Sequence, residues 1–186
     1  MNKLRADLLR FRQLIDGDNV MPLSSFRLWL TCLHPRVMPV ALVRLAEILN
    51  RNGWGRLAKL VAMINVVIFG LEVSPKVSIG GGLFLPHTVG TVVGADRIGE
   101  NCTILQGVTL GAAEMDLVYT RSTRPIIGNN VFIGAGAKVI GRVSVGDYAK
   151  IGANAVVVKD VPNHAVATGI PATFILPSDS PAVRSE

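Results

Sequence analysis

Three histidines occur in this 186-residue chain, and one of them, His87, stands where chemistry is expected. It follows Leu85-Pro86 directly and breaks an apolar pattern, and Glu72 comes 15 residues before it. A carboxylate that holds an imidazole fixes its tautomer and stabilises the imidazolium, so the imidazole can act as a general base. Such a pair suits the removal of a proton from a hydroxyl group but does not by itself identify the substrate. We therefore predict that Glu72 and His87 are catalytic.

The other two histidines have weaker claims to a chemical role. His34 precedes a proline in a predicted loop, where we expect a structural or acceptor-binding role, and His164 is expected in an exposed end cap. A zinc-dependent hydrolyase would need three histidines that converge on one metal ion. These three are spread over the predicted helices, the middle of a repeat and its end, so we expect no metal site. A non-catalytic scaffold that only binds partners remains an alternative to an enzyme.

The elements that must position these residues follow from a six-residue repeat between Glu72 and Val161. An apolar residue returns every sixth position, and a glycine often follows it. This period fits neither an α-helix nor a β-strand and is typical of a parallel β-helix, in which three short strands make one turn of the coil. One extra residue interrupts the period just after His87. The expected inward-facing residues are Ile79, Leu85, Val92, Ile98, Ile104, Leu110, Ile127, Ile133, Val139, Val145, Ile151 and Val157.

The repeat is interrupted once more, by residues 112–125 with the sequence AAEMDLVYTRSTRP. Where one repeat of six would suffice, this segment must loop out of the coil. Loops on a rigid scaffold are common places for binding groups. The candidate groups on this loop are Glu114, Asp116, Tyr119, Arg121 and Arg124.

The first 70 residues lack the repeat, and their apolar spacing, caps and breakers predict helices. We expect these helices over about 1–15, 24–33, 39–51 and 54–69. The predicted fold class is therefore α+β. Its expected parts are an N-terminal helical region (1–70), a β-helix domain (71–176) and a flexible tail (177–186).

Composition restricts the functional classes further. The formal charge is +6 and aromatic residues make up 5% of the chain, too few for a nucleic-acid stacking platform. A basic surface also suits a phosphorylated cofactor or an anionic membrane. Residues 54–71 are mostly apolar but too short to span a bilayer, so they either pack against the coil or a neighbouring subunit, or lie on a membrane surface. With no signal sequence and no disulfide framework from Cys32 and Cys102, we expect a cytoplasmic protein, free or at the inner face of the membrane.

Three motifs then occur in order: LFLPHTVGTVVG, LQGVTLG and GIPA. With them, the chain from about Pro39 to Thr173 closely resembles serine O-acetyltransferases and their bacterial polysaccharide O-acetyltransferase relatives. The resemblance implies a left-handed parallel β-helix that forms a homotrimer or a hexamer, with acetyl-CoA bound in grooves between adjacent coils. His87 matches the family's catalytic histidine, and Glu72 stands in place of its partner aspartate. The positions that match the family's CoA contacts are Gly111, Ala135, Lys150 and Ala153.

The acceptor side departs from the serine enzymes. Pro86 stands where they have an aspartate that grips the amino group of serine, and Arg124 replaces a substrate-facing histidine. In the serine enzymes an acidic residue of the helical region completes the serine site, and His34 is the nearest candidate for it here. This chain lacks most of that helical region. An ammonium group needs a nearby anion once water is excluded, whereas an arginine favours a polar or anionic acceptor.

We therefore expect an acetyl-CoA-dependent O-acetyltransferase that acts on a carbohydrate hydroxyl in capsule, exopolysaccharide or lipopolysaccharide assembly. Serine O-acetylation, a step of cysteine biosynthesis, is the alternative.

Overall fold

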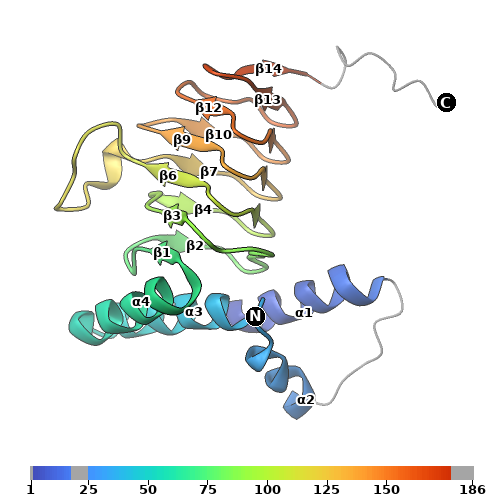
Figure 1. Ribbon diagram of the computed structural model, residues 1–186, viewed down its shortest axis with the longest axis vertical. Coiled ribbons are helices and arrows are strands. Elements are labelled where there is room, and N and C mark those ends of the chain that lie inside the picture. Colours follow the sequence, from blue (N-terminus) through green and yellow to red (C-terminus); the bar gives the residue numbers. More distant parts are fainter. Residues whose placement is uncertain (1, 18–24, 177–186) are drawn as a thin grey trace.

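The computed structural model describes residues 2–17 and 25–176, which form a coil of short strands with helices at one end (Figure 1). The helices begin and end where local chemistry favours it. Asn2 caps the first helix by accepting a hydrogen bond from Leu4 N–H, and Gly70 ends the last one in the left-handed conformation. The helical end contains α1 (Lys3–Asp16), α2 (Ser25–Leu30), the 3₁₀ turn η2 (Thr31–Leu33), α3 (Met38–Arg51) and α4 (Gly55–Phe69), and a second 3₁₀ turn, η3 (Arg121–Thr123), lies in the loop of the coil. The segment expected to be helical up to Leu33 thus changes to a 3₁₀ turn after Leu30.

Three sheets make the faces of the coil, and their strands pair parallel except for the last strand, β14. Sheet A contains β1 (Leu71–Val73), β3 (Thr91–Val93), β6 (Thr109–Gly111), β9 (Lys138–Ile140) and β12 (Val156–Val157). Sheet B contains β2 (Ser78–Ile79), β4 (Arg97–Ile98), β7 (Ile126–Ile127) and β10 (Ser144–Val145). Sheet C contains β5 (Thr103–Ile104), β8 (Phe132–Ile133), β11 (Lys150–Ile151), β13 (Val166–Thr168) and β14 (Thr173–Ile175). The chain visits A, B and C in turn, so the prediction of a hexapeptide β-helix is confirmed.

The core is a set of aliphatic columns, because equivalent residues of successive coils lie in register. In sheet A, Val93 pairs with Leu110, Leu110 with Val139, and Val139 with Val157. All four side chains are fully buried. Burial of these branched side chains is the main source of stability for such a narrow prism.

One inward-facing residue was predicted wrongly. Val93 faces the core and Val92 faces outward. The inward-facing residue after Leu85 therefore comes eight positions later instead of six, and the next one, Ile98, comes five positions after Val93. The longer turn packs against the end of α4: Thr88 Oγ1 donates to the Phe69 carbonyl (2.7 Å) and Gly90 N–H donates to the Gly70 carbonyl (2.9 Å). His87 lies in this widened turn.

Both ends of the described coil are closed by segments that do not repeat. At the first coil, the buried Arg44 guanidinium binds the Asp7 carboxylate (2.8 and 3.0 Å) and donates to the carbonyl oxygens of Ile79 (2.9 Å) and Gly80. Asp7 in turn accepts Leu83 N–H (2.8 Å), so one ion pair fixes α1 and α3 to the coil. At the other end β14 pairs antiparallel with β13. Within the described residues, no helix is both long enough and apolar enough to cross a membrane.

Candidate active site

The two edges of sheet A carry most of the predicted site residues. The edge where the chain passes from sheet C into sheet A is called here the CA edge, and it comprises residues 86–90, 105–108, 134–137 and 152–155. The edge where the chain leaves sheet A for sheet B is called the AB edge, and it includes the loop 112–125. Each strand of sheet A has two or three residues, so the two edges are on the order of 10 Å apart.

His87 is exposed at the end of the CA edge that lies nearest the helices. Above it the edge continues as stacked backbone: Gly107 N–H donates to the Val89 carbonyl (3.1 Å), and Asn154 N–H donates to the Ala135 carbonyl (2.8 Å). Two of the predicted CoA contacts, Ala135 and Ala153, therefore share an edge with His87. Their small side chains leave the backbone of this edge accessible.

Glu72 lies in the middle of β1, with an exposed side chain that faces outward from sheet A. From Glu72 the chain runs once round the coil and returns beside β1 in the turn of His87, as Thr88 and Gly90 contact the residues just before β1. No hydrogen bond or ion pair joins Glu72 to His87 among the described side chains. The two residues are thus on neighbouring segments with no hydrogen bond or ion pair between them, and the catalytic role of the pair stays a prediction.

Gly111 and Lys150 occupy other parts of the surface. Gly111 ends β6 at the AB edge, and a methyl group built on its Cα would meet no atom within 4 Å. This glycine is not needed for close packing of the described chain, so its bare backbone faces open space. Lys150 is exposed on β11 in sheet C, three residues before Ala153.

A cleft of about 540 Å³ lies between α4, sheet A and the loop, a size typical of small-molecule sites. Glu72, Val92, Thr109 and Gly111 of sheet A line it. This volume is called here the sheet A cleft. The other residues that line it include Lys59, Met63 and Val66 of α4 and Asp116, Leu117, Tyr119 and Arg124 of the loop.

Arg124 holds the loop rather than offering a free charge. The residue is 9% exposed, and its guanidinium donates to the Gly94 carbonyl (2.8 Å) and to Asp116 Oδ2 (2.9 Å) and lies 3.9 Å from the centre of the Tyr119 ring. The Tyr119 hydroxyl donates to the Ala95 carbonyl (2.7 Å), which anchors the loop a second time. We predicted Arg124 as an acceptor-binding residue, and the structure places its charge against Asp116. This removes one reason to expect an anionic acceptor.

The electrostatics of the loop agree with this anchoring. Partial desolvation of Asp116 is outweighed by hydrogen bonds from Thr120 N–H and the Arg124 guanidinium, so the pKa of Asp116 is lowered and the carboxylate stays ionised at neutral pH. Burial raises the pKa of the Tyr119 phenol, which keeps its hydroxyl proton available for the Ala95 carbonyl.

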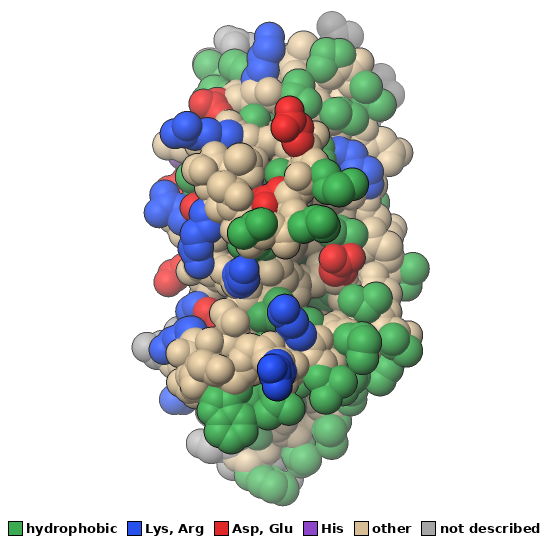
Figure 2. Space-filling view, turned by 90° about the vertical axis from the view of Figure 1, so that its left-hand side faces the viewer, with side chains coloured by type: hydrophobic (Ala, Val, Ile, Leu, Met, Phe, Trp, Pro, Cys, Tyr) green, Lys and Arg blue, Asp and Glu red, His purple; other side chains and the backbone are tan. Residues whose placement is uncertain are grey.

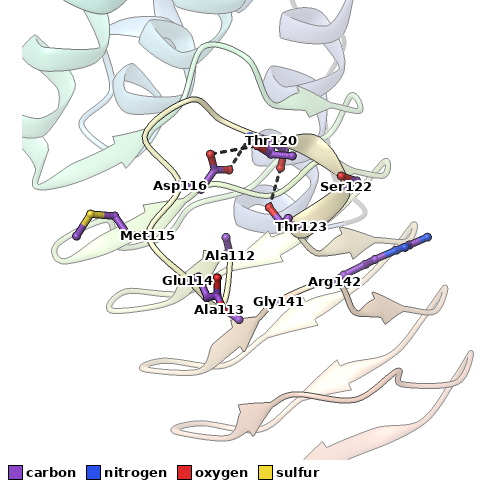
Figure 3. Close-up of a pocket in the computed structure, with 10 residues that line it drawn as sticks. All are labelled: Ala112, Ala113, Glu114, Met115, Asp116, Thr120, Ser122, Thr123, Gly141 and Arg142. Carbon is purple, nitrogen blue, oxygen red and sulfur yellow. Dashed lines mark hydrogen bonds between the residues drawn. The ribbon is translucent and has the colours of Figure 1, made fainter.

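A second cavity, of about 590 Å³, lies on the other side of the loop (Figure 3). In the close-up, Asp116 faces Thr120, whose backbone carbonyl accepts a hydrogen bond from Thr123 Oγ1 (2.9 Å), while Met115 and Arg142 point away in opposite directions. None of the residues predicted to be catalytic, to bind CoA or to bind the acceptor lines this cavity, but Glu114 and Asp116, two of the candidate groups of the loop, do.

Pro86 and His34, the other two predicted acceptor residues, lie apart from the sheet A cleft. Pro86 is half-buried directly before His87. His34 follows η2 at the helical end, where its ring lies 4.9 Å from that of Phe11 and its Nδ1 accepts Arg36 N–H (3.2 Å). These contacts give His34 a packing role in the described structure.

Sequence reasoning overlooked one residue of this region. Lys138 faces outward from β9 in sheet A, and its ammonium group donates to the Gly107 carbonyl at the CA edge. It thereby places a positive charge one coil above His87. A signal was present, because a lysine directly before the inward Val139 stands at an outward position of the repeat.

The described residues contain no group of three metal-binding side chains. His164 stacks on Tyr148 (ring centroids 4.9 Å apart) at a different edge of the coil from His87.

Known proteins share both the repeat and the helical end of this chain. Residues 124–159 match the family described as bacterial transferase hexapeptide (six repeats). The serine acetyltransferase of Helicobacter pylori is 40% identical over 144 residues, which cover 77% of this chain and 82% of that protein. The serine acetyltransferase of Mycobacterium tuberculosis is 40% identical over 143 residues, or 76% of this chain and 61% of that one.

Solved structures agree with these relatives. A serine acetyltransferase in complex with CoA has a TM-score of 0.77 and 31% identity, and covers 92% of this chain and 68% of that chain. The soybean serine acetyltransferase complexed with serine has a TM-score of 0.78 and 30% identity over 93% of this chain and 70% of that one. These relatives are serine acetyltransferases rather than the polysaccharide enzymes that we expected to be closer in character, and that part of the expectation is not supported. The chain belongs to the serine acetyltransferase family of hexapeptide-repeat transferases and is an acetyl-CoA-dependent O-acetyltransferase.

Proposed function

We propose that this enzyme transfers the acetyl group of acetyl-CoA to the side-chain hydroxyl of serine, a reaction of cysteine biosynthesis. The observation that carries the proposal is the 40% identity to a serine acetyltransferase across 82% of that protein. That relative also answers one argument for a carbohydrate acceptor. Most of its length lies within the aligned 144 residues, so a long N-terminal helical region is not required in a serine acetyltransferase.

In the proposed mechanism, His87 acts as the general base. Its imidazole takes the hydroxyl proton as the serine oxygen attacks the thioester carbonyl, and backbone N–H groups of the coil stabilise the oxyanion. The carbon–sulfur bond then breaks, and the imidazolium returns the proton to the leaving CoA thiolate. Glu72 orients the imidazole and stabilises its charged form. The products are O-acetylserine and CoA.

The cofactor residues of the proposal are Gly111, Ala135, Lys150 and Ala153. Small residues and open backbone groups let an extended pantetheine arm lie flat on the coil, and Lys150 offers a point charge for a phosphate. We further propose that the coil is left-handed. Because Gly111 and His87 lie at opposite edges of sheet A, we also propose that it assembles as a homotrimer, with a hexamer as the larger form. The CA edge of one subunit then faces the AB edge of its neighbour.

A carbohydrate hydroxyl is the second candidate acceptor, and Pro86 is the observation that favours it. A proline next to His87 offers no carboxylate to the ammonium group of serine, whose desolvation needs a nearby anion. The charge of Arg124 no longer supports this candidate, because Asp116 neutralises it.

The two candidates are separated by a direct assay. The purified enzyme is given acetyl-CoA with L-serine or with neutral and acidic sugars, and CoA release is measured together with the mass of the acetylated product. We expect saturable turnover with L-serine. Turnover with a sugar and none with L-serine would assign the carbohydrate acceptor instead, and CoA release without an acceptor would indicate hydrolysis.

A further inference from the structure

Helix α4 presents an apolar face that nothing in the described chain covers. Its buried residues, Ala58 and Asn65, lie seven positions apart on one face, and Asn65 Nδ2 donates to the Pro39 carbonyl of α3 (3.0 Å). At a rotation of about 100° per residue, one exposed side of the helix, next to the buried face, carries an apolar stripe. The stripe consists of Leu57, Leu60, Ile64, Val67 and Ile68, which are 38–78% exposed. No charged residue interrupts this stripe.

The exposed charges between residues 25 and 71 have one sign. Between residues 25 and 71 the sequence has a single acidic residue, Glu47. Glu47 is 8% exposed and its carboxylate is bound by Lys3 and Arg44, so it does not contribute a free negative charge to the surface. Figure 2 shows the helical end at the bottom with hydrophobic and basic side chains, whereas the acidic side chains in view lie higher, over the coil. Among the described side chains of residues 25–71, the exposed basic ones are Arg36, Arg51, Arg56 and Lys59.

Exposed aromatic side chains occur at the start of α4 and elsewhere on the helical end. Trp54, directly before α4, is 60% exposed, and Phe26 and Trp29 project from α2 with 73% and 43% exposure. Tryptophan rings have an apolar body and a polar N–H, and they favour the boundary between lipid and water. A helix with aliphatic residues on one side, cations beside them and tryptophan at its start matches the pattern of helices that lie in a membrane surface.

The charges decide between the candidate occupants of this face. A second copy of the same face would bring four cations against four cations, which opposes a symmetric contact. An anionic lipid surface instead attracts each Lys or Arg. We propose that the helical end, through the α4 stripe and its flanking cations, docks this enzyme on an anionic membrane surface. The catalytic coil then projects away from the lipid.

Sedimentation with lipid vesicles tests the proposal on the full chain. Vesicles of phosphatidylcholine are compared with vesicles that also contain phosphatidylglycerol, at physiological and at high ionic strength. We expect binding to the anionic vesicles only, and its loss in high salt, because screening weakens the attraction of exposed charges. Equal binding to both kinds of vesicle, or to neither, would overturn the proposal.

Matched variants show which residues are responsible. Leu60→Asn combined with Val67→Asn should abolish binding, whereas Val158→Asn, an exposed valine at the far end of the coil, should leave it unchanged. Arg56→Gln combined with Lys59→Gln should weaken binding about tenfold or more. The corresponding control, Arg97→Gln combined with Lys159→Gln, removes two exposed cations of the coil and should have little effect.

A spectroscopic readout keeps the test valid if a stripe variant folds poorly. In the Trp29→Phe variant, Trp54 is the one remaining tryptophan. Its emission should shift to shorter wavelength with anionic vesicles and be quenched by brominated lipid. An unchanged spectrum contradicts the proposal. Analytical ultracentrifugation gives a second possible contradiction. If the unmodified protein forms an oligomer that dissociates in the Leu60→Asn/Val67→Asn variant, another copy of the chain covers the stripe.

Discussion

The CA and AB edges of sheet A are held together in opposite ways. At the CA edge, short turns stack through backbone hydrogen bonds such as those of Val89 and Ala135, and His87 is exposed on that frame. At the AB edge, a long loop depends on side chains, with Arg124 bound to Asp116 and Gly94 and stacked on Tyr119. The conformation of a repeating backbone changes little when the sequence changes, whereas substitution of three side chains can change the conformation of a loop that they hold. The contrast suggests that the chemistry of this enzyme resides in the frame and its choice of acceptor in the loop.

The largest effect is expected at the CA edge. His87→Asn should lower kcat about a hundredfold or more, because it removes the proposed general base and leaves the stacked backbone intact. The measurement is the initial rate of CoA release with saturating acetyl-CoA. His164→Asn is the matched control at another edge, and asparagine tolerates its left-handed backbone (φ 62°). Equal rates for the two variants would remove His87 from the mechanism.

Glu72→Gln tests the second half of the proposed pair. We expect kcat to fall at least about tenfold, with KM for acetyl-CoA little changed, because an amide cannot stabilise the imidazolium that forms in the transition state. The dependence of kcat on pH should change as well, since the carboxylate would no longer favour the charged ring. Glu100→Gln, an exposed glutamate on the coil, is the control. A rise in KM alone would show that Glu72 binds substrate instead of orienting His87.

At the AB edge, Arg124→Met should act first on stability. The Gly94 carbonyl would lose its donor from Arg124, which costs about 1–3 kcal/mol for a buried group, and the contact with Tyr119 would be lost too. Urea unfolding measures the change, and limited proteolysis should cut within residues 112–125. Arg97→Met removes an exposed arginine of the coil and should have neither effect. If the loop of the Arg124→Met variant resists proteolysis, the side-chain anchoring of this edge is refuted.

The smallest effect is expected at Gly111. Gly111→Val should weaken CoA binding several-fold without loss of stability, because its side chain would enter open space where the proposed pantetheine arm lies. Calorimetry with CoA measures the first effect and thermal unfolding the second. Gly134→Val is the informative contrast, since its Cβ would lie 2.7 Å from Ala153 N and the coil could not close. Unchanged CoA affinity in Gly111→Val would place the cofactor elsewhere.

The coil could be predicted from the sequence because its period is local. Each inward aliphatic residue has the same environment as the residue six positions away. The spacing of Ile98, Ile104 and Leu110 therefore predicts the fold directly. The prediction failed at Val92, where two adjacent valines fit the pattern equally well. The choice of Val93 depends on the turn of His87, which packs on the end of α4 through Thr88. A contact between segments so far apart leaves no periodic signal.

The candidate site was predictable to a smaller extent. Its residues could be named from motifs, but the partner of each side chain could not. Arg124 and Asp116 are eight residues apart in a loop whose regular structure is one short 3₁₀ helix (Arg121–Thr123), and their pairing depends on how that loop folds over Gly94. The exposed stripe of α4 was visible in the sequence as an apolar run. Which side of the run is covered became clear only from the packing of Asn65 against Pro39.

The two closed ends of the coil fix the length of the molecule. A stack of parallel strands has open backbone at both ends and would otherwise accept strands from other chains, as in fibril growth. Here the guanidinium of Arg44 donates hydrogen bonds to the carbonyl oxygens of Ile79 and Gly80 at the helical end. At the other end β14 runs antiparallel to β13, so a further parallel strand would not continue the stack of sheet C. One complete extra turn spliced between β9 and β12 would therefore meet the same terminators and yield a taller but still self-limiting particle.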